Sequence, residues 1–527
     1  MERFPLLGLL SRSFPVEEKR QEDFSHWPSS LPDVEVLYVY GLSLEAYQLL
    51  SSWLHAAPQR KLLFLEDREG AFGGLLQSEQ ALPLVEDLQV ELRLIPQKRA
   101  ELNEALEKLA KENPVTTLDI IALPSQNTRH FRFLREQLFR KTMLAEAIRK
   151  DRLHGYQLFW NFVSNAPHLK NSFYVNALRG AFEQIPAIIC GAGPSLASAF
   201  ATLEKLEHRA LIVACGSAIT ACSAAGITPH ICIAVDPNEE EFSRLKQSFM
   251  FEVPFFYSTR VHPHVFSTLN GPFGYVRSQF GDVSQLWLEE ELGLTEPFIG
   301  HQLSSESISV TSMAVATLEH LGCNPILFAG MDMAYTANQR YCSSVGVRQT
   351  AQEKHTQITA DRLIQKKDRQ GKKVHSAVRW IMESSSLSHY ATLHPHVRFI
   401  NTTEGGIGFS KIPYQPLELV FNEHQLEYDL RGMMHAAISR APLPSSASSI
   451  PQQLSSLKES LLRVIEHLQV LSGEKQGVKL LAELDMKEEI AYSVLFYDML
   501  HWLSTPKGPN WPACLELACR YLEMMGL

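Results

Sequence analysis

The sequence predicts an α/β protein with a parallel-rich sheet in a central domain, a smaller α/β domain before it and a helical domain after it. Short, uniformly apolar segments alternate with helical patterns as far as Asn422, and strand patterns cease beyond that residue. Uniformly apolar strands are typical of parallel sheets that are covered on both faces by crossover helices. We therefore expect domains over residues 1–150, 151–422 and 423–527.

The composition is that of a globular protein without a nucleic-acid or membrane partner. The chain has 527 residues, of which 45% are hydrophobic and 20% charged, and its net charge is −9. That charge disfavours binding to nucleic acid, and no segment approaches the ~20 apolar residues of a membrane span. The first residues lack the basic region of a signal peptide, and the eight cysteines form no Cys-x-x-Cys pair. We expect reduced, buried thiols and a cytoplasmic location.

The first predicted domain alternates strands and helices. Its predicted strands are Val36–Tyr40, Lys61–Leu65, Glu91–Ile95 and Leu118–Leu123, and its predicted helices are Leu44–Leu54 and Arg99–Lys111. Gly41 follows the first strand, but Leu-Ser-Leu comes next instead of further glycines. A nucleotide site therefore has little support here, and we predict a structural or partner-binding role.

A glycine-rich turn opens the central domain. The apolar strand Ile188–Cys190 ends at Gly191-Ala-Gly193-Pro194-Ser195, and a helical pattern starts at Leu196. Glycines let the main chain approach a ligand closely, and the amides at a helix N-terminus attract anions. The turn predicts a Rossmann-like phosphate site with outward-facing amides. A purely structural turn stays possible, because the third glycine of the dinucleotide fingerprint is absent.

Polar residues follow the next strands of the same predicted sheet. Arg209–Cys215 ends at Gly216-Ser217, and Ile231–Val235 ends at Asp236-Pro237. The carboxyl ends of parallel strands share one edge of the sheet, which is where open α/β sheets bind ligands. Gly330-Met331-Asp332 and Asn401–Gly406 also follow predicted strands, although the second of these segments fits a plain turn equally well.

The remaining elements complete the prediction. Further strands are expected at Phe255–Tyr257, Phe273–Val276, Pro325–Gly330 and Arg398–Asn401, and helices at His130–Val163, Ser304–Leu321, Gln452–Leu471, Val478–Met499 and Cys514–Met524.

These motifs, in this order, resemble the motility-associated-factor (Maf) flagellin glycosyltransferases and their relatives, over roughly Tyr174–Phe421. The shared domain is related to 6-hydroxymethylpterin diphosphokinase MptE-like proteins, and the Gly-x-Gly-Pro-Ser-Leu turn is similar to that of bacterial sialyltransferases. The resemblance implies transfer of a nonulosonic, sialic-acid-like sugar from a CMP donor to a protein hydroxyl, with flagellin or another surface protein as acceptor.

The resemblance also implies which residues meet the donor. Ser309 and Thr311 would hold the sugar carboxylate, and Tyr341 would reach the donor phosphate. With Asn401 at its strand end, the predicted donor-binding residues are Gly191, Gly193, Pro194, Ser195, Gly216, Ser217, Ser309, Thr311, Tyr335, Tyr341 and Asn401.

The transfer needs a base for the acceptor hydroxyl and stabilisation of the departing phosphate. Asp236, Asp332 and His375 are the catalytic candidates. Amides and hydroxyls can stabilise the phosphate, so we expect no metal and no cofactor besides the donor. His375 follows the basic segment Lys366–Lys373, which fits either a solvated turn or a lid over phosphates.

The sequence departs from the family pattern at Met331, where a glutamine is usual, and at Glu306, where sialyltransferases have a basic residue. It also contains two His-Pro-His segments, His262–His264 and His394–His396. Neither is followed by a third ligand at metal-motif spacing, so we interpret both as surface turns.

Two other functions stay open. An MptE-like diphosphokinase would transfer pyrophosphate from ATP, with Mg²⁺ held by Asp236 and Asp332. Alternatively, the departures at Glu306 and Met331 favour a member of the family that has lost its chemistry and serves as a scaffold.

Overall fold

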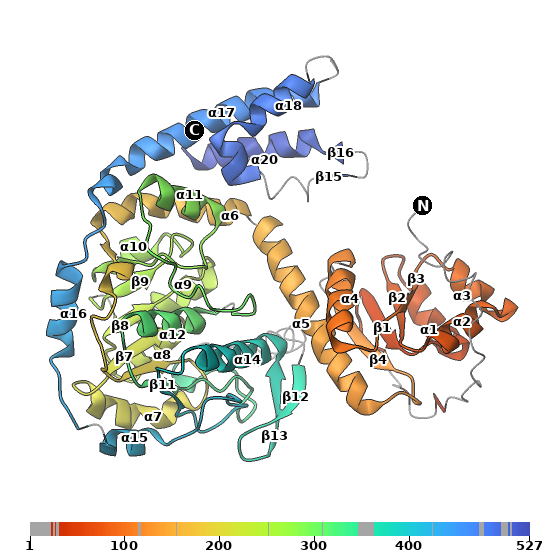
Figure 1. The fold of residues 1–527 in the computed structure, drawn as a ribbon, viewed down its shortest axis with the longest axis horizontal. Helices are drawn as coiled ribbons and strands as arrows, with labels where there is room; N and C mark the ends of the chain where they lie inside the picture. Colours follow the sequence, from red (N-terminus) through yellow and green to blue (C-terminus); the bar gives the residue numbers. More distant parts are fainter. Residues whose placement is uncertain are drawn as a thin grey trace. The chain divides into compact units, whose positions relative to one another are not determined.

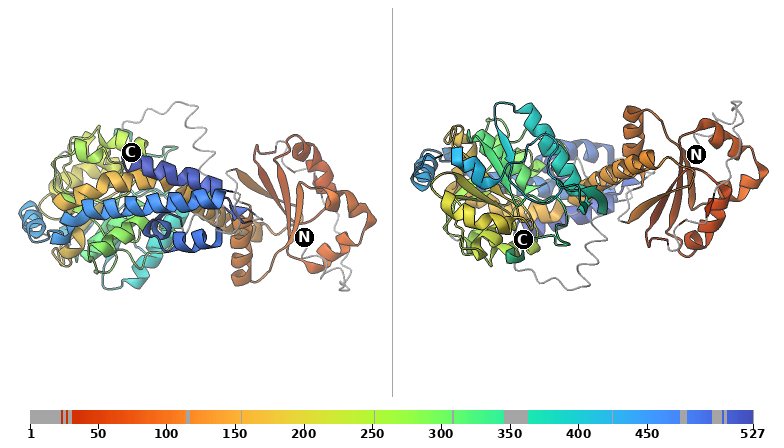
Figure 2. Two further views of the ribbon diagram at one scale, coloured as in Figure 1. Left: turned by 90° about the horizontal axis from the view of Figure 1, so that it is seen from above. Right: turned by 90° about the horizontal axis from the view of Figure 1, so that it is seen from below.

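A computed structural model describes residues 23–24, 27, 31–113, 117–153, 155–250, 252–307, 309–345, 363–423, 425–473, 479–496, 504–505 and 508–526. These residues divide into two compact units (Figures 1 and 2). The first unit takes the described residues up to Lys150, and the second takes those from Asp151 onward.

The first unit is built on a four-stranded sheet in the order β3-β2-β1-β4, with every neighbouring pair parallel. Its strands are β1 (Val36–Tyr40), β2 (Lys61–Glu66), β3 (Val90–Leu94) and β4 (Leu118–Ala122). Its helices are α1 (Leu44–His55), α2 (Glu69–Leu76), α3 (Leu82–Glu86) and α4 (Arg99–Glu112), and α5 (Thr128–Leu153) leads onward. All five residues of β1 are buried, as their uninterrupted apolar sequence predicts.

The second unit contains an eight-stranded sheet in the order β14-β11-β6-β7-β8-β9-β10-β5. All neighbouring strands are parallel. The strands are β5 (Phe173–Tyr174), β6 (Ala187–Cys190), β7 (Leu211–Cys215), β8 (Ile231–Ile233), β9 (Phe255–Tyr257), β10 (Phe273–Tyr275), β11 (Ile326–Ala329) and β14 (Phe399–Asn401). The predicted α/β class with a parallel-rich sheet is confirmed.

Helices cover both faces of this sheet (Figure 1). Ile188 and Cys190 of β6 belong to one apolar cluster, whereas Ala187 and Ile189 belong to another. Adjacent residues of a strand face opposite sides, so these two clusters are the two layers of a doubly wound fold. The helices are α6 (Gly155–Asn165), α7 (Leu196–Leu203), α8 (Ala218–Ala224), α9 (Glu239–Leu245), α10 (Val265–Thr268), α11 (Val283–Glu291), α12 (Val310–His320), α14 (Val378–Leu393), α15 (Leu417–Glu423) and α16 (Leu430–Ser439).

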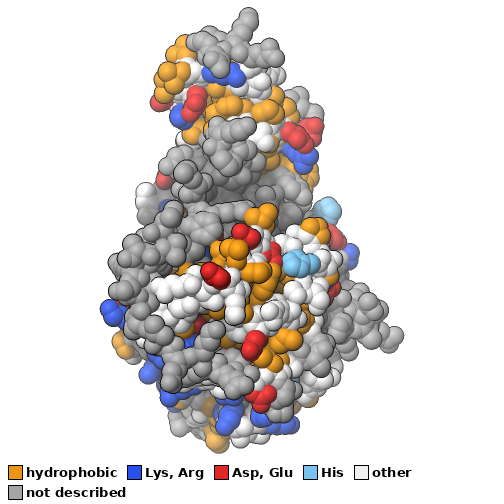
Figure 3. Space-filling view, turned by 90° about the vertical axis from the view of Figure 1, so that its right-hand side faces the viewer, with side chains coloured by type: hydrophobic (Ala, Val, Ile, Leu, Met, Phe, Trp, Pro, Cys, Tyr) orange, Lys and Arg blue, Asp and Glu red, His pale blue; other side chains and the backbone are white. Residues whose placement is uncertain are grey.

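The C-terminal helices α17 (Ile450–Ser472), α18 (Lys479–Lys487) and α20 (Trp511–Met524) extend one of these layers. The ring of Phe159 in α6 lies 4.9 Å from that of Tyr521 in α20, in an edge-to-face contact. Apolar side chains stay exposed on α18, including Leu480 and Leu481. Figure 3 shows orange, apolar side chains at its top, the end of the view where these helices lie.

Three elements differ from the sequence prediction. The helix expected over residues 478–499 is interrupted, because α18 ends at Lys487. The helix expected from Ser304 begins at Val310, because the Ser309 side chain accepts a hydrogen bond from Ser312 N and caps it. The basic segment after Gln365 is the turn of an antiparallel hairpin, β12 (Leu363–Lys367) and β13 (Lys373–Ala377).

The described residues fit the expectations for thiols. All eight cysteines are unpaired, and only Cys519 is exposed. None of the described helices has both the length and the apolar character needed to cross a membrane.

Candidate functional site

The predicted motifs gather where the strand order of the second unit reverses. Strands β7 to β10 extend from β6 in one direction, and β11 and β14 lie on its other side. In open α/β sheets a ligand crevice lies outside the carboxyl ends of the strands at such a switch point. The loops after β6, β11 and β14 therefore meet at the edge that the sequence selects.

The carboxylate of Asp332 ties these three loops together. Its Oδ1 accepts hydrogen bonds from Ser195 Oγ (2.7 Å) and Thr336 Oγ1 (2.6 Å), and its Oδ2 accepts one from Ser195 N (3.2 Å). Gly405 N, from the loop after β14, donates to Ser195 Oγ (3.2 Å). Burial raises the pKa of Asp332, against the lowering effect of its hydrogen bonds from Thr336 and Ser195. Hydrogen bonds to Asp332 thus hold these loops together.

Two glycines permit this close approach. A Cβ at Gly193 would lie 2.3 Å from Asp332 Oδ2 and 2.6 Å from Gly330 O. Gly406 has φ +77°, and a Cβ there would lie 1.7 Å from the main-chain oxygen of Asp332. A side chain at either position would push the loops apart. The glycine turn is thus shaped by contacts within the chain.

The start of α7 differs from the prediction of outward-facing amides. Ser195 N donates to Asp332, Leu196 N donates to Gly193 O (3.0 Å), and Ala197 N donates to Pro194 O (3.4 Å). These amides already have acceptors inside the protein. The first turn of α7 therefore does not present the free donors that a phosphate would use.

A second group of charges follows β7 and β8. Glu241 of α9 accepts hydrogen bonds from Ser217 Oγ (3.3 Å) and Arg244 Nη1 (2.7 Å), and Arg244 Nη1 also lies 2.9 Å from Ser217 Oγ. Gly216 has φ +50°, and a Cβ there would lie 3.0 Å from Glu241 Oε1. Gly216 and Ser217 are therefore adjacent to an ion pair that the sequence analysis did not identify.

Burial perturbs the acids of this group. Burial and the nearby charge of Asp236 raise the pKa of Glu241 to about 7, even though Arg244 and Ser217 lower it. Burial also raises the pKa of Asp236, which the charges of Arg260 and Arg244 oppose. Two neighbouring carboxyls with raised pKa values are typical of sites that move protons near neutral pH.

Ser309 and Thr311 are occupied by a third acid. Both hydroxyls donate to the carboxylate Oε1 of Glu383, a buried residue of α14. Burial raises the pKa of Glu383, opposed by these two hydrogen bonds and by the charge of Arg379. The place that the resemblance assigns to a sugar carboxylate thus holds a carboxyl group of the chain itself.

Tyr341 belongs to a cluster of arginines and aromatic rings, comprising Arg244, Arg340, Tyr341 and Trp380. The guanidinium carbons of Arg244 and Arg340 lie 5.6 and 4.9 Å from the centre of the Tyr341 ring. Arg340 also lies 5.9 Å from the centre of the Trp380 ring. Among the described residues, its buried Nε and Nη1 have no hydrogen-bond partner. Hereafter we call this set the arginine–aromatic cluster.

The arginine–aromatic cluster lies next to the glycine turn, because Cys342 N donates to Ala192 O (2.8 Å). It also adjoins Tyr335, whose ring centre is 5.2 Å from that of Trp380. The predicted base His375 is exposed on β13, and its main-chain oxygen accepts a hydrogen bond from Tyr335 N (2.8 Å).

Two further residues, Asn401 and Met331, stabilise the structure of this edge of the sheet. Asn401 is buried, and its Oδ1 accepts a hydrogen bond from Thr403 N (3.0 Å), which shapes the loop after β14. Met331 packs into the apolar layer that contains α12, and its main-chain N donates to Thr403 Oγ1 (2.9 Å). An apolar residue at 331 is thus accounted for by its burial.

Arg244, Arg340, Glu241 and Glu383 were missed by the sequence analysis. Glu241 and Arg244 are spaced three apart, as an ion pair on one helix face requires, but so are many surface pairs. Arg340 and Glu383 carry no local motif. These residues stand out only in the folded structure, where α9, α14 and the loop after β11 lie at one edge of the sheet.

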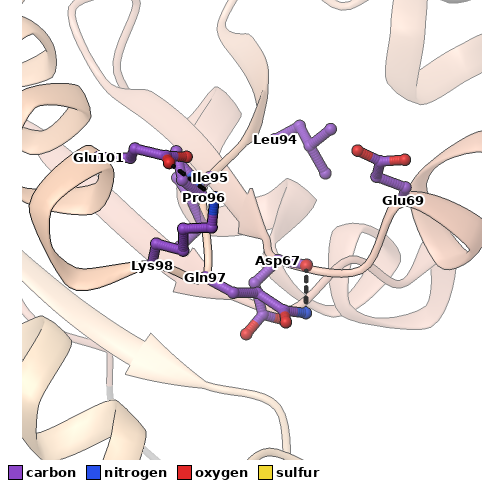
Figure 4. A pocket seen from close by; sticks show the side chains of 8 residues that line it. All are labelled: Asp67, Glu69, Leu94, Ile95, Pro96, Gln97, Lys98 and Glu101. Carbon is purple, nitrogen blue, oxygen red and sulfur yellow. Dashed lines mark hydrogen bonds and ion pairs between the residues drawn. The ribbon is translucent and has the colours of Figure 1, made fainter.

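The first unit has a hollow of its own, with a volume of about 520 Å³ (Figure 4). It lies beyond β2 and β3 and is lined by Asp67, Glu69, Leu94, Ile95, Pro96, Gln97, Lys98 and Glu101. Its only base, Lys98, pairs with Glu101 at 3.2 Å. The lining is therefore net acidic and unsuited to phosphate.

Comparison with protein families found a match over part of the predicted central domain. Residues 160–338 match the family described as 6-hydroxymethylpterin diphosphokinase MptE-like. No curated protein matches the chain. A solved structure titled "Structure of MAf glycosyltransferase from Magnetospirillum magneticum AMB-1" is similar at 15% identity and a TM-score of 0.46, covering 93% of this chain and 73% of that chain. The matched segment 160–338 contains β6 to β11, the glycine turn and Asp332, and it is similar to the MptE-like family.

Proposed function

We propose that this protein is a glycosyltransferase that moves a nonulosonic acid from a CMP donor to a hydroxyl of flagellin or another surface protein. The motif resemblance supports this proposal, and one structural observation carries it. Two arginines flank Tyr341 at the carboxyl edge of the sheet, and two buried nitrogens of Arg340 have no hydrogen-bond partner among the described residues. A phosphate oxygen is a suitable hydrogen-bond acceptor for such nitrogens.

The physical argument concerns the cost of an unsatisfied cation. A buried donor without a partner costs about 1–3 kcal/mol, and more if it is charged. Aromatic faces offset part of this cost by cation–π attraction. An anion that accepts a hydrogen bond from Arg340 would remove the remaining cost, so the protein alone is preorganised for a negatively charged ligand.

The same edge offers a base. The transition state of glycosyl transfer carries oxocarbenium character, while the phosphate departs and the acceptor hydroxyl loses its proton. In the proposal Arg340 and Arg244 stabilise the departing CMP phosphate. Glu241, whose pKa is about 7, accepts the proton, because a base works best when its pKa lies near the working pH.

The test is CMP binding by the full-length chain, measured by calorimetry. Arg340→Ala should weaken binding about 10- to 100-fold, the effect of losing a charge-assisted hydrogen bond. Arg398→Ala is the control, because Arg398 directly precedes β14 and lies at the opposite edge of the sheet. Absence of CMP binding at millimolar nucleotide, or equal weakening by both substitutions, would overturn the donor assignment.

A second candidate function is pyrophosphoryl transfer from ATP, favoured by the MptE-like match of residues 160–338. This function meets an obstacle if one Mg²⁺ ion has to be held by both Asp236 and Asp332. Their strands β8 and β11 are separated by β6 and β7, about 14 Å at the usual strand spacing. Magnesium-dependent ATP binding without CMP binding would favour this function, and binding of neither nucleotide would favour a scaffold. The cytoplasmic location also belongs to the proposal.

A further inference from the structure

The two His-Pro-His segments have different surroundings in the fold. Three potential metal ligands converge at the first, where the ligand atoms of Glu239, His262 and His264 all lie within 4.8 Å of one another. Glu239 is the first residue of α9, and the histidines lie between β9 and α10. The sequence does not reveal this third ligand, because it comes from a different element instead of following at motif spacing.

The imidazole of His262 is held in place with one nitrogen unused. Its Nε2 lies 3.1 Å from Glu239 Oε2, and its buried Nδ1 has no hydrogen-bond partner among the described residues. The Phe242 ring stacks on it, with ring centres 4.8 Å apart and an interplanar angle of 10°.

The other two ligands are also oriented. The Phe242 ring lies 5.6 Å from that of His264, in an edge-to-face contact. The second oxygen of Glu239, Oε1, accepts a hydrogen bond from Ser243 Oγ (3.0 Å) and lies 3.8 Å from Lys246 Nζ. This arrangement leaves Oε2 toward the histidines. Metal-binding carboxylates are commonly fixed in this way by outer partners.

We propose that Glu239, His262 and His264 form a binding site for a divalent transition-metal ion such as Zn²⁺. Two imidazoles and one carboxylate suit zinc and related ions, whereas Mg²⁺ and Ca²⁺ prefer oxygen ligands alone. Three protein ligands leave a fourth position for water or a ligand oxygen. The site goes beyond the proposed transferase, whose phosphate is held by arginines.

The ion would join α9 to the loop between β9 and α10. His262 also lines a small cavity with Asp236 and Glu241, so the metal site borders the acids described above. An ion there would fix the start of α9, from which Glu241 and Arg244 project. It would therefore stabilise the folded chain as well as bind to it.

The second His-Pro-His segment provides a matched control within the same chain. His394 Nδ1 contacts the main-chain oxygen of Tyr390 (2.9 Å), and His396 Nε2 lies 3.4 Å from Glu319. This set is absent from the groups of described residues whose ligand atoms converge. A surface histidine of the same motif is thus available without the proposed geometry.

The experiment is a Zn²⁺ titration of the full-length chain, without a polyhistidine tag and stripped with EDTA, followed by calorimetry. We expect one high-affinity ion per chain, at least tenfold weaker binding in His264→Ala and Glu239→Gln, and no change in His396→Ala. Co²⁺ should give visible absorption bands in the wild type that His264→Ala removes. His264 is exposed, so folding should survive its substitution, which circular dichroism verifies.

Two results would overturn the site. The first is a wild-type chain that binds no more zinc than His264→Ala. The second is an equal loss in His396→Ala. Neither result depends on a donor or acceptor substrate, so the metal site and the transferase proposal fail separately.

Discussion

The two parallel sheets of this protein have opposite kinds of carboxyl edge. The edge of the first unit borders an open hollow of about 520 Å³, yet Lys98 is the only base in its lining and is already paired. The edge of the second unit is crossed by hydrogen-bonded loops, yet it contains an arginine whose buried nitrogens have no partner among the described residues. A hollow provides space, whereas unsatisfied donors provide affinity for an anion.

The two units also differ in how their charged side chains are paired. In the first unit, Glu66 is buried and accepts hydrogen bonds from Leu42 N (3.1 Å) and from Arg68 Nε (3.0 Å). In the second, Glu241 pairs with Arg244, but Arg340 has no such carboxylate among the described residues. The two edges share a fold and differ in whether a positive charge is left for a ligand.

The largest effect is expected at Glu241. Glu241→Gln removes the proposed base and should lower the rate of sugar transfer about 10²- to 10⁴-fold. The comparison is Glu240→Gln, because Glu240 is an exposed neighbour whose oxygen lies 3.7 Å from the same arginine. Initial rates with a CMP-linked donor measure both variants. Equal rates in the two variants would remove Glu241 from the mechanism.

The pH dependence of Glu241 has a definite sign. Its pKa is about 7 in the folded chain and near the ordinary glutamate value of 4.5 when unfolded, so folding favours the protonated form. The stabilising contribution is complete below pH 4.5 and disappears as the pH rises through 7. The transfer rate should rise over the same range. Denaturant unfolding and rates at several pH values should lose both dependences in Glu241→Gln.

Asp332 should matter most for stability. Asp332→Ala removes a buried acceptor of three hydrogen bonds and should lower the free energy of unfolding by about 2–4 kcal/mol. Asp368→Ala is the control, because Asp368 accepts two main-chain hydrogen bonds in the turn between β12 and β13. We expect about 1 kcal/mol or less there. If urea denaturation gives similar losses of unfolding free energy for the two variants, Asp332 contributes no more to stability than Asp368 does.

A smaller effect is expected for Arg340→Lys. Lysine keeps the charge but loses the planar fork and the stacking on Tyr341 and Trp380. CMP affinity should fall about 3- to 10-fold, less than for alanine. Calorimetry of the lysine and alanine variants in parallel gives the ranking. If the lysine variant binds CMP as tightly as the wild type, the site needs the positive charge but not the planar guanidinium.

The smallest effect is expected in the first unit. Lys98→Ala removes the base from the hollow, but CMP affinity should stay within about twofold of the wild type. The free energy of unfolding should change by less than about 0.5 kcal/mol, because the Lys98–Glu101 pair is exposed. A marked loss of CMP affinity would reverse the contrast between the two edges.

The fold was predictable because its signals are local. The uniformly apolar sequence of β6, β7 and β1 indicates strands buried on both faces, and the structure confirms each of them. The hairpin of β12 and β13 was missed, because its exposed, basic strands lack apolar alternation. The end of α18 at Lys487 was missed as well, since a continuous helical pattern does not show where a helix ends.

The site was only partly predictable. The sequence identified the edge, because glycines and acids stand at strand ends. It did not show that Ser195 N would be taken by Asp332 or that Ser309 would be taken by Glu383. Such pairings join residues far apart in the chain, and no local spacing encodes them.

The sequence by itself determined the strands, the glycine turns and the edge at which they end, because hydrophobic periodicity and backbone freedom are properties of neighbouring residues. The tertiary structure decided which charges are satisfied. It paired Asp332 with Ser195, left Arg340 without an acceptor among the described residues, and brought Glu239 to His262. Electrostatic satisfaction depends on distances between segments remote in sequence, and only folding sets those distances.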